Sequence, residues 1–149
     1  MPDKETVERA RKDKREGKAP STQAGEFVRE EMHHVREGKH GARSTKQAIA
    51  IGLSKARRSG VKLPPPSGGK ASTRRSAQAA IRASRRRTPP SPRRARAVRH
   101  ALKREGHSAA SRKALSRQAK AAARRRPAAA RSAAARQAAR TRKRRMAAA

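Results

Sequence analysis

The sequence predicts a mostly α-helical protein in two parts. Residues 1–63 are expected to form a small helical hairpin module, and residues 71–149 a long Arg/Ala-rich polycationic tail that is disordered or forms fluctuating helix. Three observations support this prediction: the uneven distribution of charge, the scarcity of large apolar residues, and a Pro/Gly-rich linker at residues 64–70.

Positive charge is concentrated in the second part of the chain. The 149 residues include 43 Lys and Arg and 10 Asp and Glu, a formal net charge of +33. Residues 1–63 hold 16 basic and 9 acidic residues, whereas residues 64–149 hold 27 basic residues and one acidic residue, Glu105. Because like charges repel one another when a chain compacts, we expect the second part to resist folding by itself.

The apolar content of the chain is low in large side chains. Ala supplies 33 of the 49 residues counted as hydrophobic, and Leu, Ile, Val and Phe together number only 13. A share of these four types below about 20%, combined with high net charge, is typical of disordered chains. A single large folded domain is therefore not expected.

Three helices are predicted in the first part, at about residues 3–16, 22–37 and 45–59. Ser44 and Gln47 have the spacing of a capping box at the start of the third helix. Gly52 lies within that helix, where glycine costs about 1 kcal/mol relative to Ala. We therefore expect another backbone to lie close to Gly52. Apolar residues of the second and third helices form a possible face for self-association or a partner: Val28, Met32, Ile49, Ile51 and Leu53.

The second part is low in complexity. Pro and Gly divide it into candidate helical pieces at about residues 71–87, 93–104, 108–126 and 128–145. Ala and Arg favour helix, but the density of Arg opposes it, so order is expected when phosphates neutralise the guanidinium groups. Guanidinium groups suit phosphate because they can contact two oxygens at once. The preferred phosphate contacts are the clustered basic residues Arg85, Arg86, Arg87, Arg93, Arg94, Arg124, Arg125, Arg126, Arg142, Lys143, Arg144 and Arg145.

Ser91-Pro92-Arg93-Arg94 has the pattern of a turn that can lay two guanidinium groups into a narrow minor groove, although a single occurrence in an Arg/Pro/Ser-rich chain is a weak signal. This segment resembles the S/T-P-K/R-K/R elements of linker-histone tails, and residues 64–149 resemble those tails in composition. The resemblance implies contact with duplex DNA.

Residues 44–64 include Gln-Ala-Ile-Ala-Ile-Gly-Leu-Ser-Lys-Ala-Arg, and Met32 to Lys39 read Met-His-His-Val-Arg-Glu-Gly-Lys. Both segments resemble a family of small basic bacterial proteins with a domain of unknown function. The resemblance covers about residues 25–64. It implies a bacterial source and a helical module, and it assigns no activity.

Other classes of function have little support in the sequence. No Ser/His/Asp set has a scaffold, so no enzyme activity, cofactor or small-molecule substrate is expected. His33, His34 and His40 lack a Cys, and Glu30 or Glu37 would have to complete a metal site; we interpret these histidines as exposed, with no metal. Trp and Tyr are absent and Phe27 is the only aromatic residue, which argues against base-stacking platforms.

The sequence thus predicts a sequence-nonspecific DNA-binding protein, histone-like and associated with the nucleoid in the cytoplasm. A net charge of +26 in residues 64–149 matches about 45 Å of duplex, roughly 13 base pairs. The alternatives are a structural RNA-binding protein associated with the ribosome, a membrane-active polycation, and an adaptor in which the tail is incidental. No apolar run approaches the ~20 residues of a transmembrane segment, and no secretory signal is visible.

Overall fold

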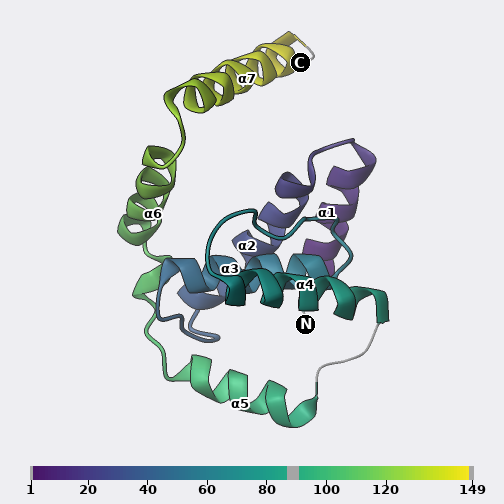
Figure 1. The fold of residues 1–149 in the computed structure, drawn as a ribbon, viewed down its shortest axis with the longest axis vertical. Coiled ribbons are helices and arrows are strands. Elements are labelled where there is room, and N and C mark those ends of the chain that lie inside the picture. Colours follow the sequence, from purple (N-terminus) through teal and green to yellow (C-terminus); the bar gives the residue numbers. More distant parts are fainter. Residues whose placement is uncertain (1, 87–90, 148–149) are drawn as a thin grey trace. The chain divides into compact units, whose positions relative to one another are not determined.

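A computed structural model describes residues 2–86 and 91–147. Within these ranges the chain forms seven α-helices and one 3-10 helix (Figure 1). Their bounds are α1 Lys4–Arg15, α2 Pro20–Arg36, α3 Thr45–Arg58, α4 Ala71–Arg86, α5 Pro92–Lys103, η1 Ser108–Ala110, α6 Arg112–Arg124 and α7 Ala128–Ala147. The chain divides into two compact units, residues 1–114 and 115–149. This division differs from the expected one, which lay at residues 64–70.

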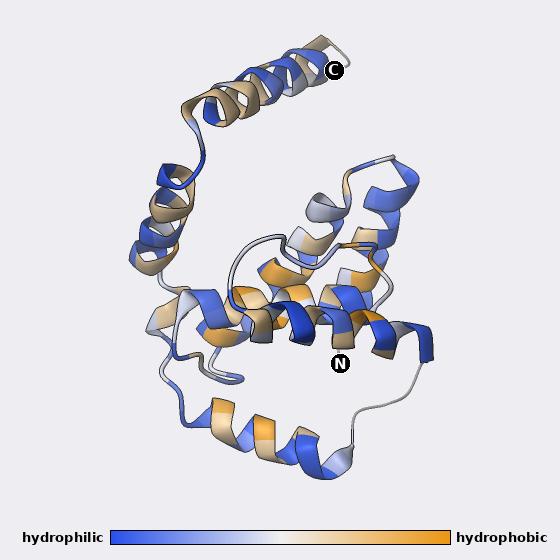
Figure 2. Cartoon of the chain, in the orientation of Figure 1, coloured by the Kyte–Doolittle hydropathy of each residue, from blue (hydrophilic) through white to orange (hydrophobic). Residues whose placement is uncertain are grey.

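The core of the first unit lies between α1, α2 and α3. Phe27 is fully buried at its centre, in contact with the small residues Ala10, Ala24 and Ala56. Val7, Leu53, Val61 and Leu63 pack around this cluster. Several of the most hydrophobic segments of the ribbon lie in these helices and others lie in α4 and α5, whereas α7 has none of them (Figure 2). Five of the few large apolar residues of the chain are therefore used in this cluster.

The close approach expected at Gly52 is confirmed. A Cβ atom at this position would lie 2.7 Å from Val28 Cα and 3.0 Å from Phe27 O. The backbones of α2 and α3 thus meet at a residue without a side chain, and these two helices pack more extensively than any other pair of elements in the described residues.

The helix ends follow local chemistry. The Ser44 hydroxyl accepts a hydrogen bond from Gln47 N at 3.2 Å, as the capping box requires. The Gln47 side chain accepts from Arg43 N at 2.8 Å, one residue earlier than the usual reciprocal bond. Gly38 and Gly60 have φ values of 73° and 89°, the left-handed conformation that ends helices at low cost for glycine.

The prediction of a disordered or fluctuating tail at residues 71–149 is wrong. Helices occupy most of the described residues in this range, and α4 packs along α3 (Figure 1). Ala77 and Ala80 of α4 are buried in this contact, at 6% and 2% exposure. The repulsion among arginines does not prevent docking because α4 places its small residues toward α3 and its arginines toward solvent.

Residues 64–70 do not separate two independent parts either. Arg57 is largely buried, and its guanidinium donates to Leu63 O at 3.3 Å and to Pro64 O at 3.0 Å. These bonds hold the start of the segment against the end of α3, so the following helix begins close to the core.

The segment from the end of α5 to η1 is bound to the first unit by hydrogen bonds over long sequence distances. Gly41 N donates to Leu102 O and Ala42 N to Gly106 O, at 2.9 and 3.0 Å. Thr45 Oγ1 donates to Ala109 O at 2.6 Å, and Arg36 Nε donates to Ala110 O at 2.8 Å. Ala109 and Ala110 are buried. Here too, alanine fits against the core where a larger residue would not.

The second unit comprises most of α6 and all of α7. Every described side chain from residue 119 onward is exposed. Ala and Arg both have high intrinsic helix propensity, which accounts for helix in a segment that buries little surface. In the described part of the chain, no helix is long and apolar enough to cross a membrane.

Candidate nucleic-acid interface

The basic residues of α4 lie on the side of the helix opposite its buried alanines. At about 100° per residue, Arg75, Arg82 and Arg86 fall on one stripe, far from Ala77 and Ala80 on the helix circumference. All the arginines of α4 are exposed. Because the alanines of α4 contact α3, the positive stripe faces solvent.

A second stripe runs along α6. Lys113, Arg117, Lys120 and Arg124 recur at i, i+4, i+7 and i+11 and are all exposed. This spacing confines them to about 60° of the helix circumference over about 16 Å of its length. The rest of α6 is mainly Ala, so the charge is concentrated on one side.

The basic residues of α7 are distributed differently. Arg131, Arg136, Arg140, Arg142 and Lys143 are exposed, and their spacing spreads them over about half of the circumference of a helix about 30 Å long. This helix presents its positive charge over a broader arc than the narrow stripe of α6.

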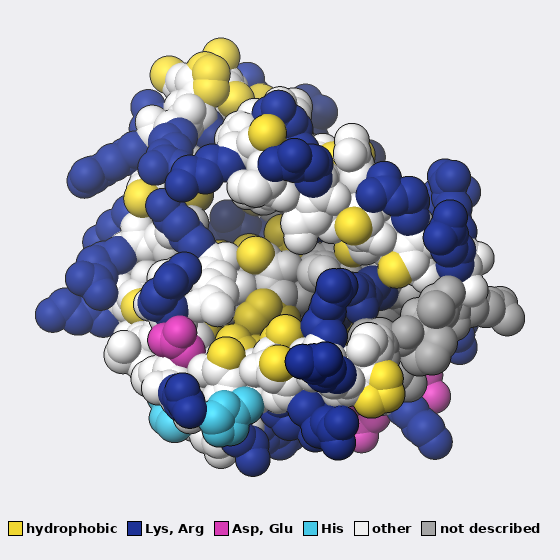
Figure 3. Space-filling view, turned by 60° about the horizontal axis from the view of Figure 1, so that its bottom comes forward, with side chains coloured by type: hydrophobic (Ala, Val, Ile, Leu, Met, Phe, Trp, Pro, Cys, Tyr) yellow, Lys and Arg dark blue, Asp and Glu magenta, His cyan; other side chains and the backbone are white. Residues whose placement is uncertain are grey.

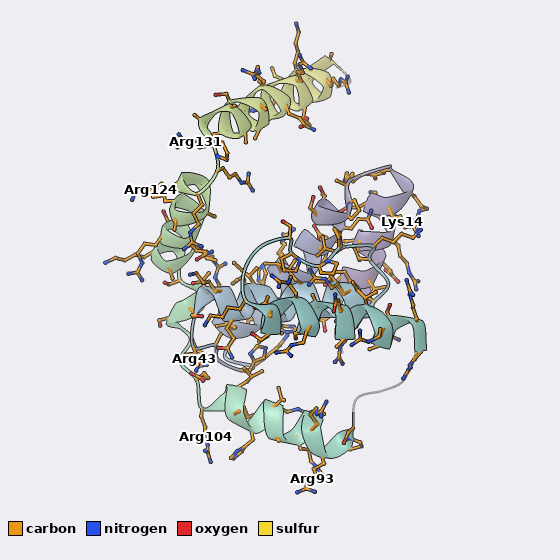
Figure 4. The ribbon with its side chains drawn as sticks, viewed as in Figure 1. Lys14, Arg43, Arg93, Arg104, Arg124 and Arg131 are labelled. Atoms are coloured by element: carbon orange, nitrogen blue, oxygen red, sulfur yellow. The ribbon has the colours of Figure 1, made fainter. Side chains whose placement is uncertain are left out.

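Ser91-Pro92-Arg93-Arg94 begins a helix rather than the expected turn. Pro92 is the first residue of α5, and Ser91 makes no side-chain capping bond. Cations are unfavourable in the first turn of a helix because of the helix dipole, so Arg93 and Arg94 lie where a bound anion would stabilise the structure. The labelled Arg93 and Arg104 project from the two ends of α5 (Figure 4).

Most of the predicted phosphate-binding residues are exposed. Arg85 and Arg86 lie at the end of α4, and Arg124, Arg125 and Arg126 lie at the end of α6 and just after it. Arg142, Lys143 and Arg144 lie near the end of α7. Arg87 and the side chain of Arg145 lie outside the described residues.

Charges in the N-terminal helices are partly neutralised. Arg9 Nε lies 2.7 Å from Glu26 Oε2, and Lys18 Nζ lies 2.7 Å from Asp13 Oδ1. The hydrogen bond to Asp13 raises the pKa of Lys18, and the hydrogen bond from Lys18 lowers the pKa of Glu16. In contrast, the sequences of α4, α5, α6 and α7 contain no Asp or Glu.

Lys and Arg side chains are spread over the visible surface in the space-filling view, and acidic side chains occur in few places (Figure 3). The positive charge of the helices after residue 70 therefore has little internal compensation. Such a surface attracts polyanions.

Sequence reasoning missed the stripes of α4 and α6. It selected consecutive arginines and passed over Arg74, Arg75, Arg82, Arg117 and Lys120, which are exposed on these helices. The basic positions of these segments do recur about every 3.6 residues. This repeat indicates a basic face only if the segments are helical.

The residues predicted as a partner face are mostly enclosed by the chain's own helices. Met32 is buried, and Val28, Ile49, Ile51 and Leu53 are partly buried. Leu53 packs against the Phe27 cluster. Among the described residues, the exposed large hydrophobic side chains are Val98 and Met146.

Comparison with known families identifies the central part of the first unit. Residues 20–67 match the model of a family of unknown function, DUF6496. This segment is a DUF6496 domain. It comprises α2, α3 and the connection that Arg57 holds, whereas α1 and the basic helices α4 to α7 lie outside the DUF6496 match. No curated protein and no solved structure is significantly similar to the chain.

Proposed function

We propose that this protein binds duplex DNA without sequence preference, through contacts of its basic helices with backbone phosphates. The observation that supports this most strongly is the division of α4 and α6 into a small-residue side and a basic side. A protein with this activity would associate with the nucleoid.

The spacing of charges on α6 suits a phosphate backbone. Its basic stripe extends about 16 Å, and phosphates follow one another along each DNA strand at about 3.4 Å of helix axis. The stripe therefore spans about five phosphates. Binding of this kind gains free energy from the release of condensed counterions and does not depend on base sequence.

The composition of the basic helices favours backbone contact over base reading. Their side chains lack the aromatic residues that stack on unpaired bases. The resemblance of residues 64–149 to linker-histone tails in composition points to the same duplex ligand. A membrane surface is less suitable, because α7 offers only Met146 as a large apolar side chain for insertion.

A salt titration of the full chain tests this proposal. Affinity for a 30-base-pair duplex would be measured by fluorescence anisotropy at several salt concentrations. The variant Arg117→Gln/Lys120→Gln/Arg124→Gln removes three cations from α6, and the slope of log K against log[salt] should become shallower by about 2.7.

The matched control is Arg11→Gln/Lys14→Gln/Arg15→Gln on α1. Like the α6 variant, it removes two arginines and one lysine from exposed positions. On α1, however, the basic residues are interspersed with acidic residues. Its slope should stay close to that of the unaltered chain. Equal loss in both variants would mean that only net charge matters, and no loss in the α6 variant would refute the role of the stripe.

Competition separates the ligand classes. Duplex DNA, structured RNA and anionic vesicles would be compared at equal phosphate concentration. Preferential displacement by DNA supports the proposal, whereas preference for RNA or vesicles would replace it with a ribosomal or membrane role.

A further inference from the structure

A cluster of ionisable side chains lies inside the first unit, in and beside the DUF6496 domain. Glu30, Glu31 and His34 come from α2, Lys55 comes from α3, and His40 lies in the connection between these helices. Glu30 and Glu31 are buried, with side-chain exposures of 2% and 0%. The function proposed above makes no use of these groups.

Glu31 is the most unusual member of the cluster. Neither of its carboxylate oxygens accepts a hydrogen bond of acceptable geometry from any described residue. Lys55 Nζ lies at ion-pair distance, 2.8 Å from Oε2, but it also donates to Glu30 Oε1 at 3.1 Å. A buried carboxylate with unsatisfied oxygens costs several kcal/mol unless a cation compensates it.

The neighbours of the two histidines define which ring nitrogen can bind a cation. His40 Nδ1 lies 3.0 Å from Gly41 O. Because a carbonyl only accepts, this nitrogen must donate, and His40 Nε2 is left facing Glu31 Oε1 at 3.4 Å. His34 Nε2 lies 3.2 Å from Asp3 Oδ2, a contact that leaves His34 Nδ1 with its lone pair.

A neutral His40 would therefore direct its lone pair at a carboxylate oxygen. Two acceptors 3.4 Å apart repel each other, and a cation between them would remove this repulsion. A metal ion bound between Glu31 and His40 would supply this positive charge.

We propose that Glu31, His34 and His40 bind a divalent transition-metal ion of the Zn²⁺ class. Their ligand atoms all lie within 4.8 Å of one another. In a tetrahedral site with Zn²⁺ bonds of about 2.0–2.1 Å, neighbouring ligand atoms are about 3.4 Å apart. The Glu31–His40 distance matches this value, and modest side-chain movement would bring His34 into the same shell.

The hydrogen bonds around the histidines are those that metal sites use. Metal-bound histidines usually donate their second ring nitrogen to a carbonyl or carboxylate, which orients the ring. Gly41 O has this position for His40 and Asp3 for His34. A cavity of about 310 Å³ is lined by Asp3, Glu30 and His34, so it opens beside one of the three proposed ligands.

The Lys55 ammonium group already neutralises part of the negative charge of Glu30 and Glu31 that a metal ion would neutralise. Its side chain is 21% exposed, so its ammonium group can withdraw toward solvent when a divalent ion neutralises Glu31. The sequence prediction of no metal was based on His33, His34 and His40 together. The structure instead groups His34 and His40 with Glu31, while His33 is exposed.

Zn²⁺ binding by the untagged full chain tests the proposal. Protein freed of metal with a chelator would be titrated with Zn²⁺ by calorimetry without nucleic acid, and Co²⁺ would report tetrahedral coordination through its visible absorption. We expect one equivalent of Zn²⁺ to bind and to raise the thermal unfolding temperature. Loss of an orienting neighbour of a ligand costs about 10- to 100-fold in affinity, so His40→Gln and Glu31→Gln should cost at least about 100-fold.

His33→Gln is the matched control, because His33 precedes His34 on the same helix but is exposed and outside the cluster. It should retain full Zn²⁺ affinity. Lys55→Gln removes the competing ammonium and should bind Zn²⁺ more tightly, and circular dichroism at 222 nm of every variant separates loss of the site from loss of the fold. Absence of stoichiometric binding, or equal loss in His33→Gln and His40→Gln, would overturn the proposal and leave Lys55 as the cation that compensates Glu31. DNA binding by the basic helices is independent of either result.

Discussion

The contact between α2 and α3 at Gly52 makes a prediction that opposes helix propensity. Replacing glycine by alanine inside a helix ordinarily stabilises it by about 1 kcal/mol. At Gly52, however, the new Cβ atom would lie 2.7 Å from Val28 Cα and 3.0 Å from Phe27 O. These are backbone atoms of another helix, which cannot rotate away as the end of a side chain can.

Gly52→Ala is therefore expected to force α2 and α3 apart next to the buried Phe27. Overpacking of this kind costs about 1–3 kcal/mol. We expect a cost near the upper end of this range because the backbones of both helices must move. Subtracting the gain in helix propensity of about 1 kcal/mol leaves a net loss of about 2 kcal/mol in the free energy of unfolding. In a protein with so small a core, that loss is a large fraction of the total stability.

Gly25→Ala in α2 is the matched control. Gly25 is exposed, and an added Cβ would meet nothing within 4 Å, so this variant should gain up to about 1 kcal/mol. Urea unfolding followed by circular dichroism at 222 nm would measure both variants. If Gly52→Ala were as stable as the unaltered chain, the close contact between the helices would be refuted.

Two further predictions concern the packing of the first unit. Ala80→Leu should destabilise the docking of α4 by about 1–3 kcal/mol because Ala80 is buried, whereas Ala79→Leu at the adjacent exposed position should have little effect. The rate of protease cleavage within residues 64–70 would report undocking of α4. Equal cleavage of both variants would contradict the contact between α4 and α3. Burial acts to lower the pKa of Lys55, but Glu31 and Glu30 together raise it above 10.5. The stability from this ion pair is thus complete at neutral pH and lost only as pH rises through the raised pKa. Lys55→Met in metal-free protein should lose about 3 kcal/mol at pH 7 and show a weaker further loss above pH 10.5; an unchanged alkaline profile would count against the pair.

Much of the first 60 residues was predictable from local rules. Helices expected at about 3–16, 22–37 and 45–59 occur at Lys4–Arg15, Pro20–Arg36 and Thr45–Arg58. Ser44 acts as the predicted cap, and Gly52 lies at a close backbone approach. Propensity, capping and periodicity act over a few residues, so the order of residues is sufficient to reveal them.

The sites depend on contacts between distant segments. Glu31, His34 and His40 come together because the chain turns back after Gly38, and the spacing of three histidines did not indicate which carboxylate joins them. The basic stripes of α4 and α6 likewise become faces only once these segments are helical.

By itself, the sequence determined where the charge lies, where the first helices begin and end, and which glycine lies at a helix contact. Only the tertiary structure decided that the Ala/Arg-rich segment after residue 70 docks by Ala77 and Ala80, and that residues 102–110 bond to the start of α3 and its neighbours. The physical reason is that an alanine side chain has little apolar area to bury, so its contribution cannot be read from a count of hydrophobic residues. Its small size stabilises a fold only where another helix approaches closely enough to bury it.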